Sequence, residues 1–188
     1  ISYFDLLSTG VKPSGKHIAI IGGGGIGFDV AAFLLQQAGQ TKEQFAGNWG
    51  VDLSMGARAG LVKPAEHGTP AYKITMLQRK TTRMGRGLGK TTGWAHRAEL
   101  KRSGVKMLTG VTYQKIDDAG LHVLMDEKPC TIAVDHIIIC AGQNSRRDLQ
   151  APLESAGKSV HLIGGADVAM ELDAKRAIKQ AVTQALSI

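Results

Sequence analysis

The chain of 188 residues alternates short apolar runs with glycine-rich and polar stretches. An apolar run at 17–21, a cluster of glycines and a mostly apolar stretch from about 25 to 37 predict a buried strand, a tight turn and a helix. Apolar runs at 73–78 and 105–108, with a helical pattern between them at 92–103, predict two further strands joined by a helix. Strands that alternate with helices in this way are typical of a parallel sheet.

The pattern then changes to that of antiparallel strands. Two alternating segments, near 111–116 and 120–125, flank Asp117-Asp118-Ala119-Gly120, which predicts a hairpin. The apolar run 135–141 predicts a strand that is buried on both faces. The fold class expected from these signals is α/β: a Rossmann-like nucleotide-binding domain with a parallel sheet, into which an antiparallel hairpin meander is inserted.

Two parts of the chain give weaker patterns. The stretch 38–72 is long, rich in glycine and poorly periodic, and connections of this length are usually functional or partly disordered. At the other end, a polar loop at 143–158 leads to a predicted strand, Ser159–Ile163, a turn at Gly164–Asp167 and a helix that runs to about 186. Residues 1–16 are expected to form a connecting segment that lies against the domain.

The glycines after the first strand have the spacing Gly22-x-Gly24-x-x-Gly27, which is the dinucleotide-binding fingerprint. Gly22 would make the tight turn, Gly24 would let a pyrophosphate approach the backbone, and Gly27 would let the helix pack closely on the strand. Backbone N–H groups at the start of the helix, from Gly25, Ile26 and Gly27, would hold the phosphates with the help of the helix dipole. A glycine-rich turn that binds nothing is the alternative.

The charge of the chain indicates which nucleotide is bound. Ten of the 23 Lys and Arg residues lie between Lys73 and Lys106, against one of the 16 acids, so the net charge of +7 is local. In this fold an acid about 20 residues past the glycines normally binds the ribose 2′-hydroxyl of NAD. Here the second strand ends in Gln78-Arg79-Lys80 with no acid, and cations suit a 2′-phosphate. Arg79 and Lys80 therefore favour NADP(H) over NAD(H).

Composition excludes several other functions. No apolar run reaches the length of a membrane span, no secretory signal segment begins the chain, and two cysteines make no disulfide framework, so a reducing cytoplasmic setting is expected. The histidines show no i, i+4 pairing, so no metal site is expected. A nucleic-acid role for the basic region is disfavoured because Trp94 is its one aromatic residue.

The motifs, taken together, resemble those of a known family. The matching pieces are the Gly22–Gly27 turn, Asn48–Asp52, Met76–Lys80, Gly87–Trp94, Gly104–Met107, Val111–Asp117, Ile139–Gln143 and His161–Asp173. They cover almost the whole chain, which resembles the C-terminal part of the bacterial NADPH-dependent 2,4-dienoyl-CoA reductases. That family falls among the old-yellow-enzyme and trimethylamine dehydrogenase-like flavoproteins.

The resemblance implies a modular enzyme in which NADPH reduces FAD, and electrons then pass through a 4Fe-4S cluster to FMN and a dienoyl-CoA of unsaturated fatty acid metabolism. Residues 1–15 would be a connecting segment, 16–143 the NADP(H)-binding domain, and 144–188 the returning strand and helix of an incomplete FAD-binding domain. Gly142 is included among the cofactor-binding residues, and Asp167 would lie near the ribityl or pyrophosphate of FAD.

The chain lacks a second glycine fingerprint, a cysteine quartet and a barrel, and it begins at Ile1 without a Met, which fits a fragment of a longer polypeptide. The barrel, the FMN and the cluster would belong to the remaining domains, which would be its partners. The fragment is therefore expected to bind NADP(H), to hold FAD weakly or not at all, and to contain no catalytic residue for substrate reduction. A non-catalytic NADP(H)-sensing or interaction module is the alternative function.

Overall fold

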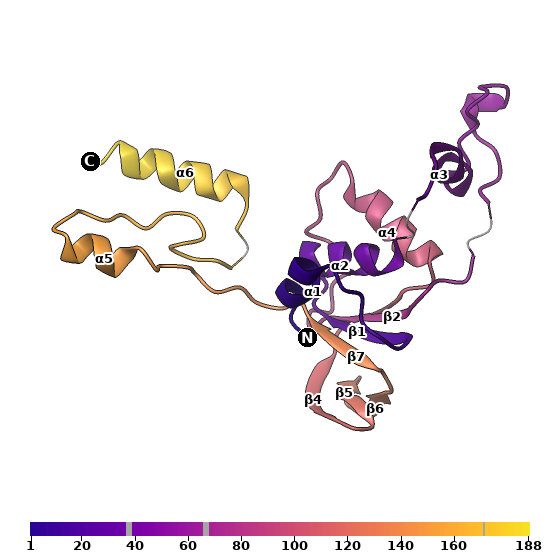
Figure 1. The fold of residues 1–188 in the computed structure, drawn as a ribbon, viewed down its shortest axis with the longest axis horizontal. Coiled ribbons are helices and arrows are strands. Elements are labelled where there is room, and N and C mark those ends of the chain that lie inside the picture. Colours follow the sequence, from indigo (N-terminus) through magenta and orange to yellow (C-terminus); the bar gives the residue numbers. More distant parts are fainter. Residues whose placement is uncertain (37–38, 66–67, 171) are drawn as a thin grey trace. The chain divides into compact units, whose positions relative to one another are not determined.

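The computed structural model describes residues 1–36, 39–65, 68–170 and 172–188. The chain divides into two compact units, Ile1–Ala141 and Gly142–Ile188 (Figure 1).

A parallel sheet of four strands is the centre of the first unit. Its strands, in the spatial order β3-β2-β1-β7, are β3 (Lys106–Leu108), β2 (Lys73–Leu77), β1 (His17–Ile21) and β7 (His136–Ile139). Helix α2 (Gly25–Leu35) connects β1 toward β2, and helix α4 (Gly93–Arg102) connects β2 to β3. These elements lie within a few residues of the predicted ones, although residue 37, the predicted end of α2, lies outside the described residues. The structure confirms the α/β Rossmann-like fold.

Alternate side chains of β1 enter two different cores, because successive residues of a strand point to opposite faces of the sheet. Ile18 and Ile20 pack with Phe28 and Leu34 of α2, and all four are fully buried. Ala19 faces the other way and packs with the buried residues Leu77, Val111, Leu121 and Val123. Figure 1 shows the same arrangement, with α2 and α4 on one side of the sheet and β4–β6 on the other.

The second core is covered by a separate antiparallel sheet with the order β4-β5-β6. Strands β4 (Thr112–Asp117) and β5 (Gly120–Met125) form the predicted hairpin, in which Asp117 pairs with Gly120. The third strand, β6 (Lys128–Ile132), has no counterpart in the sequence prediction. Its turn consists of Asp126 and Glu127, both at positive φ (+48° and +63°), so the glycine or asparagine that normally marks such a turn is absent.

Strand β7 is less buried than its apolar sequence predicts. It lies at the edge of the sheet, and the Ile139 side chain is 46% exposed. The outer side of β7 is partly occupied by the first residues of the chain: the Ile139 N–H donates to Ile1 O (2.9 Å), and the Ile1 amino group donates to Ile137 O (2.9 Å). The prediction of a strand buried on both faces was wrong, because Ile138 on one face is fully buried while Ile139 on the opposite face is partly exposed.

The start of the chain forms a short helix, α1 (Tyr3–Thr9), within the segment that was expected only to connect. Ser2 caps it by accepting a hydrogen bond from Asp5 N, and Gly10 ends it in the left-handed conformation (φ +66°). Leu6 anchors the helix in the first core, where it is 2% exposed.

The poorly periodic stretch contains a second short helix, α3 (Lys42–Trp49), which begins with a capping box between Thr41 and Gln44. A 3-10 turn, η1 (Arg58–Gly60), follows it. Trp49 of α3 meets Trp94 of α4 edge-on, with ring centroids 6.4 Å apart, and Arg102 of α4 donates to Asn48 O. The described parts of 38–72 are therefore tied to α4, while residues 37–38 and 66–67 lie outside the described residues.

The second unit contains helices α5 (Gln150–Ser155) and α6 (Ala174–Ala185). The predicted strand Ser159–Ile163 does not form, because a strand needs a neighbour for its ladder hydrogen bonds and the described part of this unit contains no other strand. The last helix starts later than predicted, at Ala174, with Asp173 as its cap. In the described residues of either unit, no helix has the length and apolar character required to cross a membrane.

Candidate nucleotide-binding site

The glycine turn joins the end of β1 to the start of α2. Gly22 has φ +130°, and its N–H donates to Leu77 O of the neighbouring strand (2.9 Å). A Cβ atom on Gly22 would lie only 2.5 Å from Cys140 O, because the chain leaving β7 crosses directly beside it. Both the backbone conformation and the lack of space require glycine at this position.

The other two fingerprint glycines differ in what surrounds them. A Cβ atom on Gly27 would overlap Gly22 O, so glycine here allows α2 to approach the turn. A Cβ atom on Gly24 would meet nothing within 4 Å, and the same holds for Gly25. The space in front of the turn is therefore open on the side where a ligand backbone could approach.

The start of α2 supplies hydrogen-bond donors toward this open space. Gly24 is the N-cap in extended conformation, and the first hydrogen bond of the helix runs from Phe28 N to Gly24 O (3.2 Å). The N–H groups of Gly25, Ile26 and Gly27 precede that bond, so they have no acceptor within the helix. Such groups, together with the positive end of the helix dipole, form a site for phosphate oxygens. The geometry fits a pyrophosphate, and binding by these residues stays a prediction.

The cation pair lies at the same edge of the sheet as the glycine turn. Ile21 pairs with Leu77 in parallel register, so Arg79 and Lys80 follow β2 just as the glycines follow β1. Both side chains are exposed. Burial raises the pKa of the Tyr113 phenol on β4, and the positive charge of Arg79 acts in the opposite direction and lowers that pKa. Arg79 therefore lies near the antiparallel sheet.

The loop that carries these cations is fastened to the glycine turn. Gly85 N donates to Gly23 O (3.2 Å), and Met84 beneath it is 2% exposed. From α4, Arg97 donates to Gly85 O (2.9 Å). In the described part of the chain, Arg97 Nε is a buried atom with no hydrogen-bond partner. From the sequence, Arg97 was only one of several cations in the basic region. Its position in the sequence did not indicate that its side chain would support the loop.

A cleft of about 590 Å³ lies between this loop and α4. Its lining combines cationic and apolar side chains: Arg83, Met84, Trp94, Arg97, Ala98, Lys101, Val105, Met107 and Thr109. Arg83, Arg97 and Lys101 lie beside apolar side chains in this cleft, a combination that suits an anionic ligand with an apolar part.

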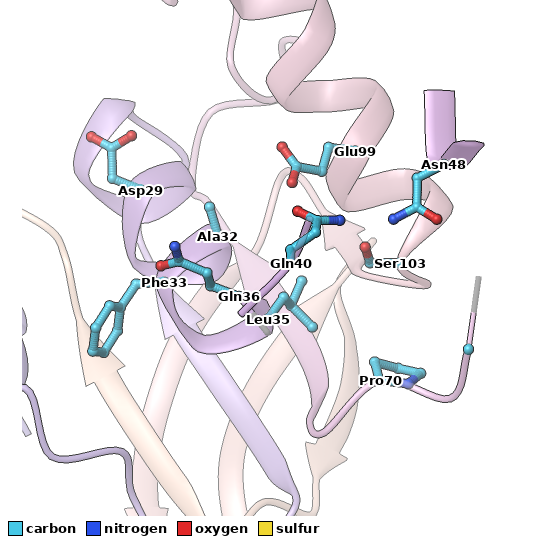
Figure 2. A pocket seen from close by; sticks show the side chains of 11 residues that line it. Asp29, Ala32, Phe33, Leu35, Gln36, Gln40, Asn48, Pro70, Glu99 and Ser103 are labelled. Carbon is cyan, nitrogen blue, oxygen red and sulfur yellow. The ribbon is translucent and has the colours of Figure 1, made fainter. Parts of the chain in front are cut away.

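A second pocket, of about 460 Å³, lies along α2 from Asp29 onward, and its lining has a different chemistry (Figure 2). Asp29 and Glu99 contribute carboxylates to it, and Gln36, Gln40 and Asn48 contribute amides. Carboxylates repel phosphate, and none of the predicted cofactor-binding residues lines this pocket. It is not the candidate nucleotide site.

The remaining two predicted residues are in the second unit. Gly142 has φ +83° and space around its Cα. The Asp167 carboxylate accepts a hydrogen bond from Gln180 Nε2 (2.6 Å), and its backbone oxygen accepts from Arg147 (2.5 Å). A role for Asp167 toward FAD stays a prediction, and residue 171 of the same motif lies outside the described residues.

The two cysteines lie in different environments. Cys130 is exposed on β6, and Cys140 is buried beside the glycine turn. Burial raises the pKa of the Cys140 thiol to about 12, so this thiol is protonated at neutral pH. Among the described residues, no cluster of three or more His, Cys, Asp or Glu could hold a metal ion.

The parallel sheet, the glycine turn and the open helix start define an α/β dinucleotide-binding domain. The chain belongs to the pyridine nucleotide-disulphide oxidoreductase family, whose pattern it matches over residues 4–178. Its fold is that of the nucleotide-binding domains of this family.

Similar proteins are much longer than this chain. A metal reductase from Desulforamulus reducens is 26% identical over 174 residues, which are 88% of this chain and 24% of that protein. The solved structure of a 2-naphthoyl-CoA reductase matches with a TM-score of 0.61 at 20% identity, covering 96% of this chain and 22% of the other. A 6-hydroxypseudooxynicotine amine oxidase from Pseudomonas geniculata matches with a TM-score of 0.60 at 18% identity, covering 88% and 21%. These two structures show the fold, and the chain spans about a quarter of its relatives' length.

Proposed function

We propose that this chain is the NADPH-binding part of a multi-domain flavoprotein reductase related to the 2,4-dienoyl-CoA reductases. Its task is to hold NADPH so that hydride passes from the nicotinamide to FAD, for the reduction of a dienoyl-CoA elsewhere in the same protein. The observation that carries the proposal is the open glycine turn with an exposed cation pair, Arg79 and Lys80, at the same sheet edge.

The choice of NADPH follows from charge. An acid that would bind the 2′-hydroxyl of NAD is absent from the sequence between Gln78 and Ala98, whereas Arg79, Lys80 and Arg83 supply positive charge there. Arginine binds a phosphate with two hydrogen bonds, and lysine binds it as a point charge. The 2′-phosphate of NADPH is the group that this loop is suited to hold.

The protein's contribution to such a reaction is placement, since the cofactors carry the hydride chemistry. The N–H groups of Gly25, Ile26 and Gly27 would hold the pyrophosphate, and the Gly22 turn would keep side chains away from it. Asp167 would contribute to a partial FAD site, and Gly142 is proposed as a further cofactor-binding residue. FMN, a 4Fe-4S cluster and the acyl-CoA site are proposed for the remaining domains of the longer protein, and this part of the proposal rests on the sequence motifs.

Calorimetric titration of the chain with NADPH and NADH side by side tests the proposal. We expect NADPH to bind more tightly, and Arg79→Ala and Lys80→Ala each to weaken NADPH by about tenfold or more, because a hydrogen bond to a charged group contributes about 1.5–3 kcal/mol. NADH, which lacks the 2′-phosphate, should be little affected. Equal losses for both nucleotides would contradict the assignment of the pair, and the absence of binding would contradict the proposal itself.

A further inference from the structure

Gln78 is the first residue after β2, and its backbone is held on the side away from the glycine turn. Gln78 N donates to Leu108 O (3.0 Å), and Gln78 O accepts from Val111 N (3.1 Å). The residue that immediately precedes the cation pair is thus fixed to the connection between β3 and β4. Its side chain is half-buried.

The Gln78 side chain hydrogen-bonds to the loop that follows. Its Nε2 donates to Lys80 O (3.0 Å) and to Thr82 O (2.5 Å), so both amide hydrogens are used by carbonyls of the cation loop. Lys80 O also accepts from Gly110 N (3.1 Å). The backbone at Lys80 is therefore held from two directions, and its position does not depend on the long and exposed side chains of the pair.

The same amide lies against the glycine turn. A Cβ atom on Gly23 would overlap Gln78 Oε1 and would lie 2.7 Å from Met84 Cγ. The far end of the loop is attached to this glycine as well, through the hydrogen bond from Gly85 N to Gly23 O (3.2 Å). Gln78 thus contacts both halves of the candidate site, the turn suited to the pyrophosphate and the loop suited to the 2′-phosphate.

We infer that Gln78 is a positioning residue that sets the preference for NADPH over NADH by fixing the cation loop relative to the glycine turn. This inference rests on the proposed function. A 2′-phosphate is connected to the pyrophosphate through one ribose, which limits the distance between them, so the cations bind it only when the loop and the turn are correctly spaced. Glutamine supplies two N–H donors and no charge, whereas glutamate would place a carboxylate against two carbonyl oxygens and near the phosphate.

Two variants separate positioning from charge. Gln78→Glu removes the donors and adds a negative charge, whereas Gln78→Met removes the donors at similar size without adding a charge. We expect both to raise the Kd for NADPH, by about tenfold in Gln78→Glu and less in Gln78→Met, while the Kd for NADH changes less than about twofold. Gln36→Glu is the matched control: it adds the same charge in the same unit, at an exposed site on the pocket of Figure 2.

Each outcome decides between defined alternatives. Loss of NADPH affinity in Gln78→Glu but not in Gln78→Met would mean that the added charge alone acts, which would overturn the positioning role. Equal losses of NADPH and NADH would assign Gln78 to the glycine turn and would also overturn it. If the unchanged chain prefers NADPH and both variants keep that preference, the inference fails while the proposed function stands. If the unchanged chain shows no preference for NADPH, both fail. Thermal melting of each variant, in the absence of nucleotide, separates these results from unfolding.

Discussion

The two units of the chain differ in the interactions that stabilise each of them internally. In the first unit, apolar side chains such as Ile20, Phe28 and Met76 are fully buried between a sheet and its helices. In the second unit, Ala169 is the one described residue that belongs to the buried apolar set, while Ile178, Val182 and Leu186 of the α6 region are 64%, 54% and 84% exposed. Helix α6 of the second unit is amphipathic, and its apolar side is exposed within the described part of that unit.

Polar contacts take the place of a core in the second unit. Arg147 donates to Ala166 O (2.7 Å) and to Asp167 O (2.5 Å), and Gln180 of α6 binds both Asp167 and Gly164 N. Such contacts each contribute little net stability in water, whereas burial of a large apolar side chain contributes about 1.5–3 kcal/mol. The first unit is therefore stabilised by its own apolar core. The second unit has a defined turn at Gly164–Asp167, but it buries much less apolar surface.

The largest expected effect comes from emptying the first core. Phe28→Ala removes a side chain with no exposed surface and should lower the free energy of unfolding by about 3–5 kcal/mol. Val182→Ala on α6 removes an exposed side chain and serves as the matched control, with an expected change below about 0.5 kcal/mol. Urea unfolding of both variants measures the difference. Similar losses of unfolding free energy in the two variants would mean that Val182 is buried in solution, and would contradict the contrast between the two units.

A smaller effect, on binding rather than on folding, is expected at the glycine turn of the first unit. Gly24→Val places a side chain in the open space that we assign to the pyrophosphate, so it should weaken NADPH and NADH alike, by about tenfold or more. The melting temperature should change little, because a Cβ atom there meets no neighbour within 4 Å. Gly47→Val, at a similarly open glycine on α3, is the control for binding. Unchanged affinity in Gly24→Val would remove the pyrophosphate from this turn.

A pH-dependent effect is expected from Cys140 of the first unit. Its pKa in the folded chain is about 12, above the ordinary value of 9.0, so the unfolded chain loses the thiol proton first. This contribution to stability is fully present below about pH 9 and is lost as the pH rises toward 12. The difference in unfolding free energy between the unchanged chain and Cys140→Ala should therefore shrink over that range. Cys130→Ser, at an exposed thiol, should leave the dependence unchanged, and a constant difference for Cys140→Ala would show that its thiol is solvated.

The smallest effect is expected on the apolar side of α6. Ile178→Ser together with Val182→Ser replaces two exposed apolar side chains, and the free energy of unfolding of this chain should change by less than about 0.5 kcal/mol per site. Denaturant unfolding followed by circular dichroism measures it. A loss of several kcal/mol would show that these side chains are covered, and the contrast between the units would have to be abandoned.

The parts of the fold that the sequence predicted correctly are those with strong local signals. Strand β1, helix α2, strand β2 and helix α4 combine apolar periodicity with glycine turns, and their bounds were predicted within one or two residues where the structure describes them. The missed strand β6 follows a turn formed by Asp126 and Glu127, which lacks the glycine that usually marks such a turn. Helices α1, α3 and α5 have six to eight residues, too few to give a clear helical period.

The errors concern neighbours rather than local propensity. The apolar sequence of β7 predicted burial on both faces, but nothing in the sequence of β7 indicates that the face with Ile139 is left partly uncovered. Ser159–Ile163 has the composition of a strand but no described strand beside it within its own unit. At the candidate site, residue types and spacing predicted the glycine turn and the cation pair. They could not predict that Gln78 and Arg97 hold the loop in place, because those contacts depend on the folded backbone.

The hydrogen bonds between Ile1 and β7 determine how the first unit can be connected. Because Ile1 O accepts from Ile139 N, Ile1 lies beside β7, close to the end of this unit at Ala141. The same geometry would allow circular permutation, in which a short linker joins the two ends and new termini are opened at the exposed turn between β5 and β6.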